Sequence, residues 1–299
     1  DCFICFSSGS KSHVGKIAFI DSNTSYYAGG FMGILRVKNE SINSRYMFNI
    51  LNSVHYRSLV RAKSDGANIN NLSNELGEIR IPLPPLSVQE QIVSECEAVD
   101  AEYRKAKMNI RMARQEILDK FKNMNAQKKK EYKLANHSIF DVSIGRRVLD
   151  KDLQKNGEIA VYSANVLEPF GYINKLLLTN FSLPSVIWGI DGDWMVNFIP
   201  ANVKFYPTDH CGVIRIKTPD IEPEYFMFAL EEAGKAARFS RTLRASTDRI
   251  KAMIIQLPSI ESQKKFVQIY RKAQKQIEEM KQIIVAASAK KQAVLDKWL

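Results

Sequence analysis

Two polar loops carry the side chains best suited to bind nucleic acid. Residues 238–249 contain four arginines among serine and threonine hydroxyls, and residues 57–71 form a similar loop in the first half of the chain. Arginine can donate two hydrogen bonds to O6 and N7 of guanine, and asparagine can form two hydrogen bonds with N6 and N7 of adenine. Serine and threonine hydroxyls bind phosphates. For any single arginine, a solvated helix end followed by a polar loop is at least as good an interpretation. Recurrence of the loops at the same place in both halves favours DNA binding.

Further basic side chains lie near predicted turns, and the chain as a whole is basic. It has 43 Lys and Arg against 32 Asp and Glu, giving a net charge of +11, which favours a polyanionic partner. An anionic membrane would also satisfy this charge, but no apolar run reaches the ~18 residues of a spanning helix. We therefore expect a cytoplasmic protein that binds double-stranded DNA and no membrane. The candidate DNA contacts are Lys11, Lys16, Arg61, Lys63, Asn68, Arg146, Arg147, Arg241, Arg244 and Arg249.

Catalytic and metal-binding interpretations are weaker. Asp191, Asp193, Asp209 and His210 could form a metal or acid–base cluster, but Asp191 and Asp193 also fit a tight turn, where aspartate is common for its hydrogen bonds to the backbone. The corresponding positions of the first half include Gly9 and Ser10 rather than two acids, so the repeat does not preserve such a site. We expect no catalytic residue, no metal site and no cofactor in this chain.

Two other short motifs lack the pattern that their chemistry needs. The glycine-containing turn before Gly15 departs from a phosphate-binding loop, because Ile17 stands where a magnesium-binding hydroxyl is required. Cys2 and Cys5 lie three apart in a predicted strand, so their thiols point to opposite faces. With Cys96 and Cys211 they make four scattered cysteines, which suit a reducing compartment better than a disulfide framework.

Two long helices must hold these loops in place. Apolar residues recur at alternating spacings of four and three from Ile92 and again from Phe266, which is typical of a coiled coil. Ser87 and Glu90 suggest a capping box at the first helix start. Two helices of matched length with one apolar stripe each predict an intramolecular antiparallel pair. The expected seam consists of Ile92, Val99, Tyr103, Ile110 and Ile117 with Phe266, Tyr270, Ile277, Ile284 and Val294.

The globular parts repeat as well. Residues 33–38 (GILRVK) align without gaps with residues 212–217 (GVIRIK), each as a strand followed by a helix. The chain is therefore predicted to be an α+β tandem pseudo-repeat of two α/β units, each followed by a long helix. The second unit opens with residues that have no counterpart before residue 1, so we expect the first unit to lack roughly 45 N-terminal residues. The expected divisions are an incomplete first globular domain (1–86), a long helix (87–126), a basic linker (127–136), a second globular domain (137–258) and a second long helix (259–299).

The segment IPLPPLSVQEQIV at residues 81–93, the heptad helices and the tandem units together resemble the specificity subunit of type I restriction-modification systems. The resemblance implies two target recognition domains, each reading one half of a bipartite DNA sequence, spaced by the coiled coil. It also implies two modification subunits docked around the helices, and restriction subunits. S-adenosylmethionine, ATP and magnesium would belong to these partners. The chain departs from the family in its shortened first domain and in Gln256 and Ser259, which replace prolines of the second motif.

Two alternatives remain open at this point. The chain could be the recognition portion of a fused methyltransferase-nuclease, although it contains no Asn-Pro-Pro-Tyr or Asp-Pro-Pro-Tyr methylation motif and no Walker loop. It could also be a coiled-coil interaction protein whose basic loops serve solubility alone.

Overall fold

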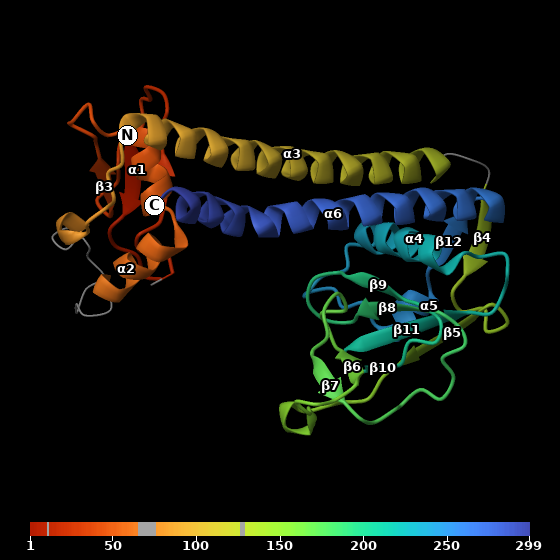
Figure 1. Ribbon diagram of the computed structural model, residues 1–299. Coiled ribbons are helices and arrows are strands. Elements are labelled where there is room, and N and C mark those ends of the chain that lie inside the picture. Colours follow the sequence, from red (N-terminus) through yellow and green to blue (C-terminus); the bar gives the residue numbers. More distant parts are fainter. Residues whose placement is uncertain (11, 65–75, 126–128) are drawn as a thin grey trace. The chain divides into compact units, whose positions relative to one another are not determined.

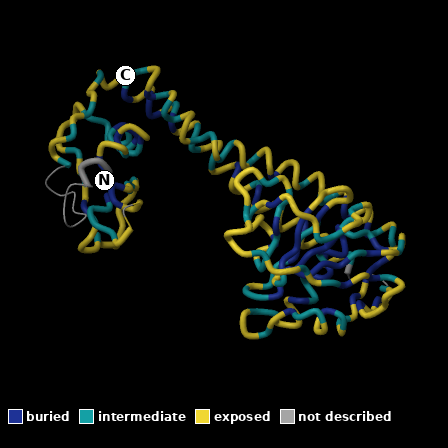
Figure 2. The backbone as a smooth tube through the Cα atoms, turned by 90° about the horizontal axis from the view of Figure 1, so that it is seen from below, coloured by how far each residue is buried: buried dark blue, intermediate teal, exposed yellow. Residues whose placement is uncertain are grey.

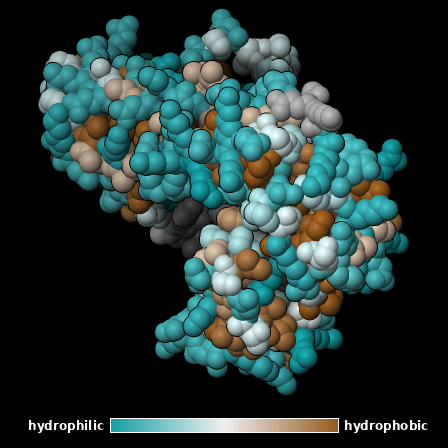
Figure 3. Space-filling model, turned by 90° about the vertical axis from the view of Figure 1, so that its right-hand side faces the viewer, coloured by the Kyte–Doolittle hydropathy of each residue, from teal (hydrophilic) through white to brown (hydrophobic). Residues whose placement is uncertain are grey.

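The computed structural model describes residues 1–10, 12–64, 76–125 and 129–299, with the backbone alone for residues 61–64 and 125. The chain divides into two compact units, residues 1–113 with 275–299 and residues 114–274. Figure 1 labels most elements of both. On the face seen in Figure 3 hydrophilic side chains predominate, and hydrophobic residues form separate patches. Among the described helices, none is long and apolar enough to cross a membrane.

The second unit is built on a four-stranded antiparallel sheet. Its strand order is β5-β11-β8-β9, and β11 pairs with β5 on one side and β8 on the other. All five residues of β8 are buried, as are most of those in β11, and the buried positions gather inside the unit (Figure 2). Such continuous apolar runs are typical of strands covered on both faces. The strands are β5 (Phe140–Ile144), β8 (Ser185–Gly189), β9 (Val196–Ile199) and β11 (Cys211–Ile216).

Smaller elements complete this unit. A three-stranded sheet has the order β10-β6-β7, in which β10 runs parallel to β6. Helix α4 begins at a proline, which is favoured in the first helical turn, and packs against β8 and β9. The elements are a short 3-10 turn (Asp150–Asp152), β6 (Ile159–Tyr162), β7 (Gly171–Ile173), β10 (Phe205–Pro207), α4 (Pro223–Ala236) and α5 (Thr247–Lys251).

Part of the expected basic linker is a strand instead. Residues 130–133 form β4 (Lys130–Lys133), which pairs antiparallel with β12 (Ile254–Leu257). Tyr132 is 4% exposed, whereas the charged residues around it face solvent. The run of charges predicted a solvated connector, because Tyr132 is the single inward-facing residue of this short alternating strand.

The first unit repeats the strand arrangement of the second. Its sheet has the order β2-β1-β3, which matches β9-β8-β11 in sequence order and direction. A strand-to-helix passage follows in both units, with Asn43 capping α1 by accepting from the amides of Arg45 and Tyr46. The tandem α+β organisation predicted from the sequence is therefore confirmed. The elements are β1 (Cys2–Cys5), β2 (Ile17–Phe19), β3 (Met32–Leu35), α1 (Ser44–Leu51), α2 (Val54–Ser64) and a 3-10 turn (Leu76–Glu78).

The long helices are α3 (Leu86–Asn125) and α6 (Ile260–Trp298), and they pack antiparallel. Within the first unit, ion pairs join Glu95 to Lys297 at 2.8 Å and Glu102 to Lys290 at 2.7 Å. Residue numbers thus rise along one helix as they fall along the other. All ten expected seam residues are buried or half-buried. Lys291, which interrupts the apolar stripe, makes a 2.6 Å ion pair with Asp100.

A buried glutamine anchors the start of each long helix. Gln89 is fully buried; its side-chain oxygen accepts from the Asn43 amide, and its nitrogen donates to the carbonyls of Ser41 and Pro84 at 2.8–2.9 Å. α3 begins at Leu86, so Ser87 lies in the first turn and not at the N-cap that the capping-box prediction required. The amides of Val88 and Gln89 bond instead to the carbonyl of Pro85.

The second helix uses the equivalent side chain in the same way. Gln263 is fully buried and accepts from the Glu222 amide at 2.9 Å. Its nitrogen donates to the carbonyls of Pro258 at 2.8 Å and Asp220 at 3.3 Å. We call these two residues the glutamine anchors.

The packing beside the two anchors differs between the units. In the second unit Phe228 lies 5.0 Å from Phe266 and 4.8 Å from Tyr270, ring centre to ring centre, and Phe121 completes an aromatic cluster. In the first unit the positions equivalent to Phe228 and Tyr270 hold Asn49 and Cys96.

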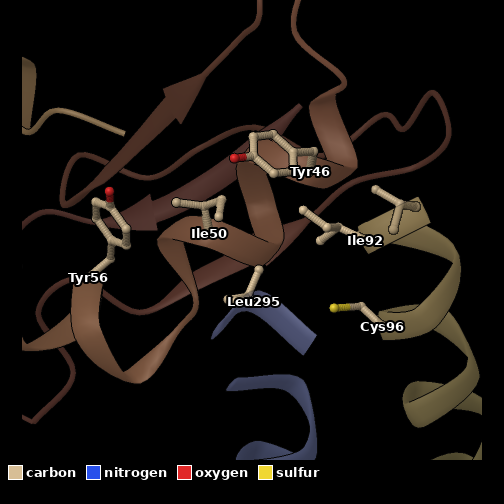
Figure 4. Packing of buried hydrophobic residues seen from close by; sticks show 7 residues of the cluster. Tyr46, Ile50, Tyr56, Ile92, Cys96 and Leu295 are labelled. Carbon is tan, nitrogen blue, oxygen red and sulfur yellow. The ribbon is translucent and has the colours of Figure 1, made fainter. Parts of the chain in front are cut away.

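These smaller side chains leave space in the first unit. Both line a cavity of about 240 Å³ between α1, α2 and the two long helices. Figure 4 shows the apolar cluster here, to which α1, α2, α3 and α6 all contribute.

Candidate nucleic-acid interface

Three loops of the second unit meet at one end of the four-stranded sheet. They follow β8, precede β11 and follow β5, and backbone hydrogen bonds join them. The Ile190 amide donates to the His210 carbonyl at 3.0 Å, and the Arg146 amide donates to the Pro207 carbonyl at 3.2 Å. A side chain at Gly145 would collide with the Pro207 carbonyl, so this close approach requires glycine. The register of β11 thus gathers residues that are far apart in the sequence.

The loop of residues 238–249 is fastened to the same end. The Ala245 amide donates to the Ile190 carbonyl at 3.1 Å, and its own carbonyl accepts from the indole nitrogen of the fully buried Trp188 at 2.8 Å. Arg249 donates to the Arg244 carbonyl at 2.7 Å. Ser246 caps α5 by accepting from the Arg249 amide. The arginine-bearing loop is therefore held at its centre by the sheet.

Asp191 organises the side chains on this surface. It follows β8 in a turn that Gly192 completes at φ +87°, a conformation that glycine adopts without strain. Nε of Arg244 pairs with one carboxylate oxygen, and Nη2 donates to the other at 2.9 Å. Nδ1 of His210 contacts that second oxygen. Partial burial alone would raise the pKa of Asp191, but the bonds from His210 and Arg244 and the arginine charge hold it below its ordinary value.

The other predicted residues of this unit lie nearby and are exposed to solvent. Arg146 and Arg147 are exposed directly after β5, and Arg249 is exposed on α5. Arg241 is 80% exposed, and its Nε lies 3.9 Å from a similarly exposed Asp193. These exposed cations can reach a polyanion, as phosphate contacts require.

Among the candidates of the first unit, Lys16 is the one whose side chain the structure describes. Lys16 is exposed just before β2, whereas Arg61 and Lys63 lie in α2 without described side chains. Lys11 and Asn68 fall outside the described residues. The candidate interface that the structure describes therefore lies in the second unit.

The acidic residues are not arranged as a metal site. Among the residues that the structure describes, no group of three or more His, Cys, Asp or Glu side chains could hold a metal ion. Asp191 is occupied by Arg244 and His210, and Asp209 lies 3.9 Å from Nε2 of His210. The sequence presented Asp191 as a turn residue. Its partners are 19 and 53 residues away, so their contact could not be predicted.

Comparisons with known proteins agree with this architecture. The family model for the type I restriction modification DNA specificity domain matches residues 2–110 and 116–287. The specificity subunit of the type I restriction enzyme EcoKI from Escherichia coli is 35% identical over 123 residues, which are 41% of this chain and 26% of that protein. A putative type I specificity subunit from Mycoplasma pneumoniae is 26% identical over 208 residues, covering 65% of this chain and 80% of that one.

Solved structures show the same fold. The S subunit of the type I restriction-modification system from M. genitalium superposes with a TM-score of 0.62 at 13% identity, over all of this chain and 82% of that one. A structure described as showing complex assembly and conformational transition of the type I system gives the same TM-score at 15% identity, over 99% of this chain and 81% of that one. The match to EcoKI spans about a quarter of that subunit's length. The family model, in contrast, covers nearly the whole chain, and this protein therefore belongs to the type I restriction modification DNA specificity domain family.

Proposed function

We propose that this chain is the DNA-sequence-recognition subunit of a type I restriction-modification complex and is itself non-catalytic. The observation that carries the proposal is the loop cluster at one end of the second unit's sheet. There an arginine-bearing loop is fastened to the sheet by Trp188 and Ile190 and presents exposed cations. A rigid basic surface with hydrogen-bonding side chains has what sequence readout requires, because phosphate contacts position a protein and contacts to base edges specify the site.

The long helices suit a spacer and docking role. Their seam is apolar, whereas most of their other faces are charged and exposed, as at Arg111, Arg114 and Lys272. We propose that methyltransferase subunits dock on these faces and that each recognition domain reads one half of a bipartite target. S-adenosylmethionine, ATP and magnesium would act on the methyltransferase and restriction subunits.

The test is to express this chain with a methyltransferase subunit of its own system and to sequence the methylated adenines of the host genome. We expect a split motif that appears when both proteins are present and disappears when either is absent. Pull-down of the methyltransferase with no methylated motif and no DNA affinity would favour the interaction-protein alternative and refute the proposal.

A further inference from the structure

We propose that Arg244 reads a guanine in the half-site bound by the second unit and that Asp191 is the positioning residue that aims it. The inference rests on the proposed function. It adds the base that is read, the atoms that read it, and a role for an aspartate that touches no DNA.

The guanidinium group of Arg244 has two edges, and each can make two parallel hydrogen bonds. Arginine has five N–H donors in a planar fork. Asp191 takes the side edge, since its two oxygens pair with Nε and Nη2 of Arg244. The end edge, formed by Nη1 and the remaining hydrogen of Nη2, has no partner among the described residues, and the side chain is 57% exposed. This edge presents two parallel donors, which match O6 and N7 of guanine in the major groove.

The surroundings of Asp191 hold this orientation. Its second oxygen is shared with His210, and its side chain is 26% exposed, compared with 75% for Asp193. The residue after Arg244 is tied to the sheet through both its amide and its carbonyl. A side chain held at its base by the backbone and at its tip by a carboxylate loses little conformational entropy when it binds. The negative charge of Asp191 also repels a phosphate, so the free edge favours an uncharged base.

Arg241 and Asp193 form a matched control within the same surface. Their closest approach is 3.9 Å, beyond hydrogen-bond distance, and both side chains are at least 75% exposed. An arginine without a fixed orientation neutralises phosphate charge but does not select a base. Loss of Arg241 should therefore weaken binding to every sequence alike.

The experiment uses the full chain with its methyltransferase subunit. The DNA ligands are duplexes that contain the motif identified by sequencing of methylated adenines, and duplexes in which each base pair of that motif is replaced in turn. Fluorescence anisotropy at several salt concentrations gives the affinities. For R244A and R244K we expect the preference for one G·C pair of the half-site to fall by about 10- to 100-fold, the range for losing one bidentate base contact. D191N should relax the same position. R241A should keep the base preference and reduce the slope of log affinity against log salt by about one.

The outcomes distinguish a failure of the guanine assignment from a failure of the proposed function. Sequence-specific binding by the wild type with an unchanged preference in R244A and R244K refutes the guanine assignment and leaves the proposed function intact. Loss of the preference in those two variants but not in D191N removes the positioning role of Asp191. Absence of any sequence preference in the wild-type complex overturns the proposed function and this inference together. R244K keeps the positive charge, so it remains informative if R244A does not fold.

Discussion

Replacing Gln263 with leucine tests whether the glutamine anchor stabilises the second unit. The side chain is fully buried and bonds three backbone groups, the Glu222 amide and the carbonyls of Pro258 and Asp220. A buried polar group left without a partner costs about 1–3 kcal/mol. Two of the three bonds are only partly buried, so we take about 1 kcal/mol, the lower end of that range, for each backbone group. Leucine has a similar size and removes the glutamine's own need for partners, so the expected loss is about 3 kcal/mol of unfolding free energy.

The assay is thermal and urea unfolding followed by circular dichroism. About 3 kcal/mol corresponds to a decrease in Tm of roughly 6–12 °C for a cooperative unit of this size. Gln268→Leu is the matched control, since Gln268 is exposed on the same helix and should change stability by less than about 0.5 kcal/mol. A Gln263→Leu protein as stable as this control would refute the reasoning, because the three backbone groups would then have found other partners at no cost.

Three further predictions concern the packing of each unit. Phe121→Ala should lower the unfolding free energy by about 3–5 kcal/mol in urea titrations, because Phe121 is 2% exposed within an aromatic cluster; a loss under 1 kcal/mol would contradict the packing. Asn49→Phe should raise it by about 0.5–2 kcal/mol, since it places in the first unit's cavity the ring that Phe228 supplies in the second, and a decrease would mean that the cavity cannot accept a ring. Burial raises the pKa of Glu224 despite the 2.7 Å bond from Arg271, so the folded state binds that proton more tightly than the unfolded state. Stability relative to Glu224→Gln should therefore fall as the pH rises above about 4.5, and urea titrations between pH 4 and 7 that show the opposite slope would exclude this burial effect.

The long-range architecture could be predicted because it repeats at regular spacings. The apolar stripes starting at Ile92 and Phe266 indicated two helices, and the GILRVK and GVIRIK segments indicated two units of the same design. Both predictions use periodicities that are set by backbone geometry alone. The strand at residues 130–133 was missed because four residues around one buried tyrosine give too short a pattern against a strong charge signal.

The candidate site was predicted in part. Arginine content and repetition indicated the loop of residues 238–249, which the structure places beside the ends of β5 and β8. The pairing of Arg244 with Asp191 depends on the register between β8 and β11 and on a backbone bond between Ala245 and Ile190. Such contacts between distant residues have no local sequence pattern. The charged side chains could therefore be listed from the sequence, but their orientation could not.

The glutamine anchors have a consequence for how this protein can change over time. Each anchor makes hydrogen bonds to main-chain atoms, which every residue possesses. The packing of a domain on its helix at this point therefore depends little on the side chains of the domain. In the second unit, β11 separates the anchor from the loop cluster: His210 precedes the strand, and Asp220 and Glu222 follow it. The loop residues at one end of the strand can therefore change during evolution while the hydrogen bonds of the anchor at the other end are maintained.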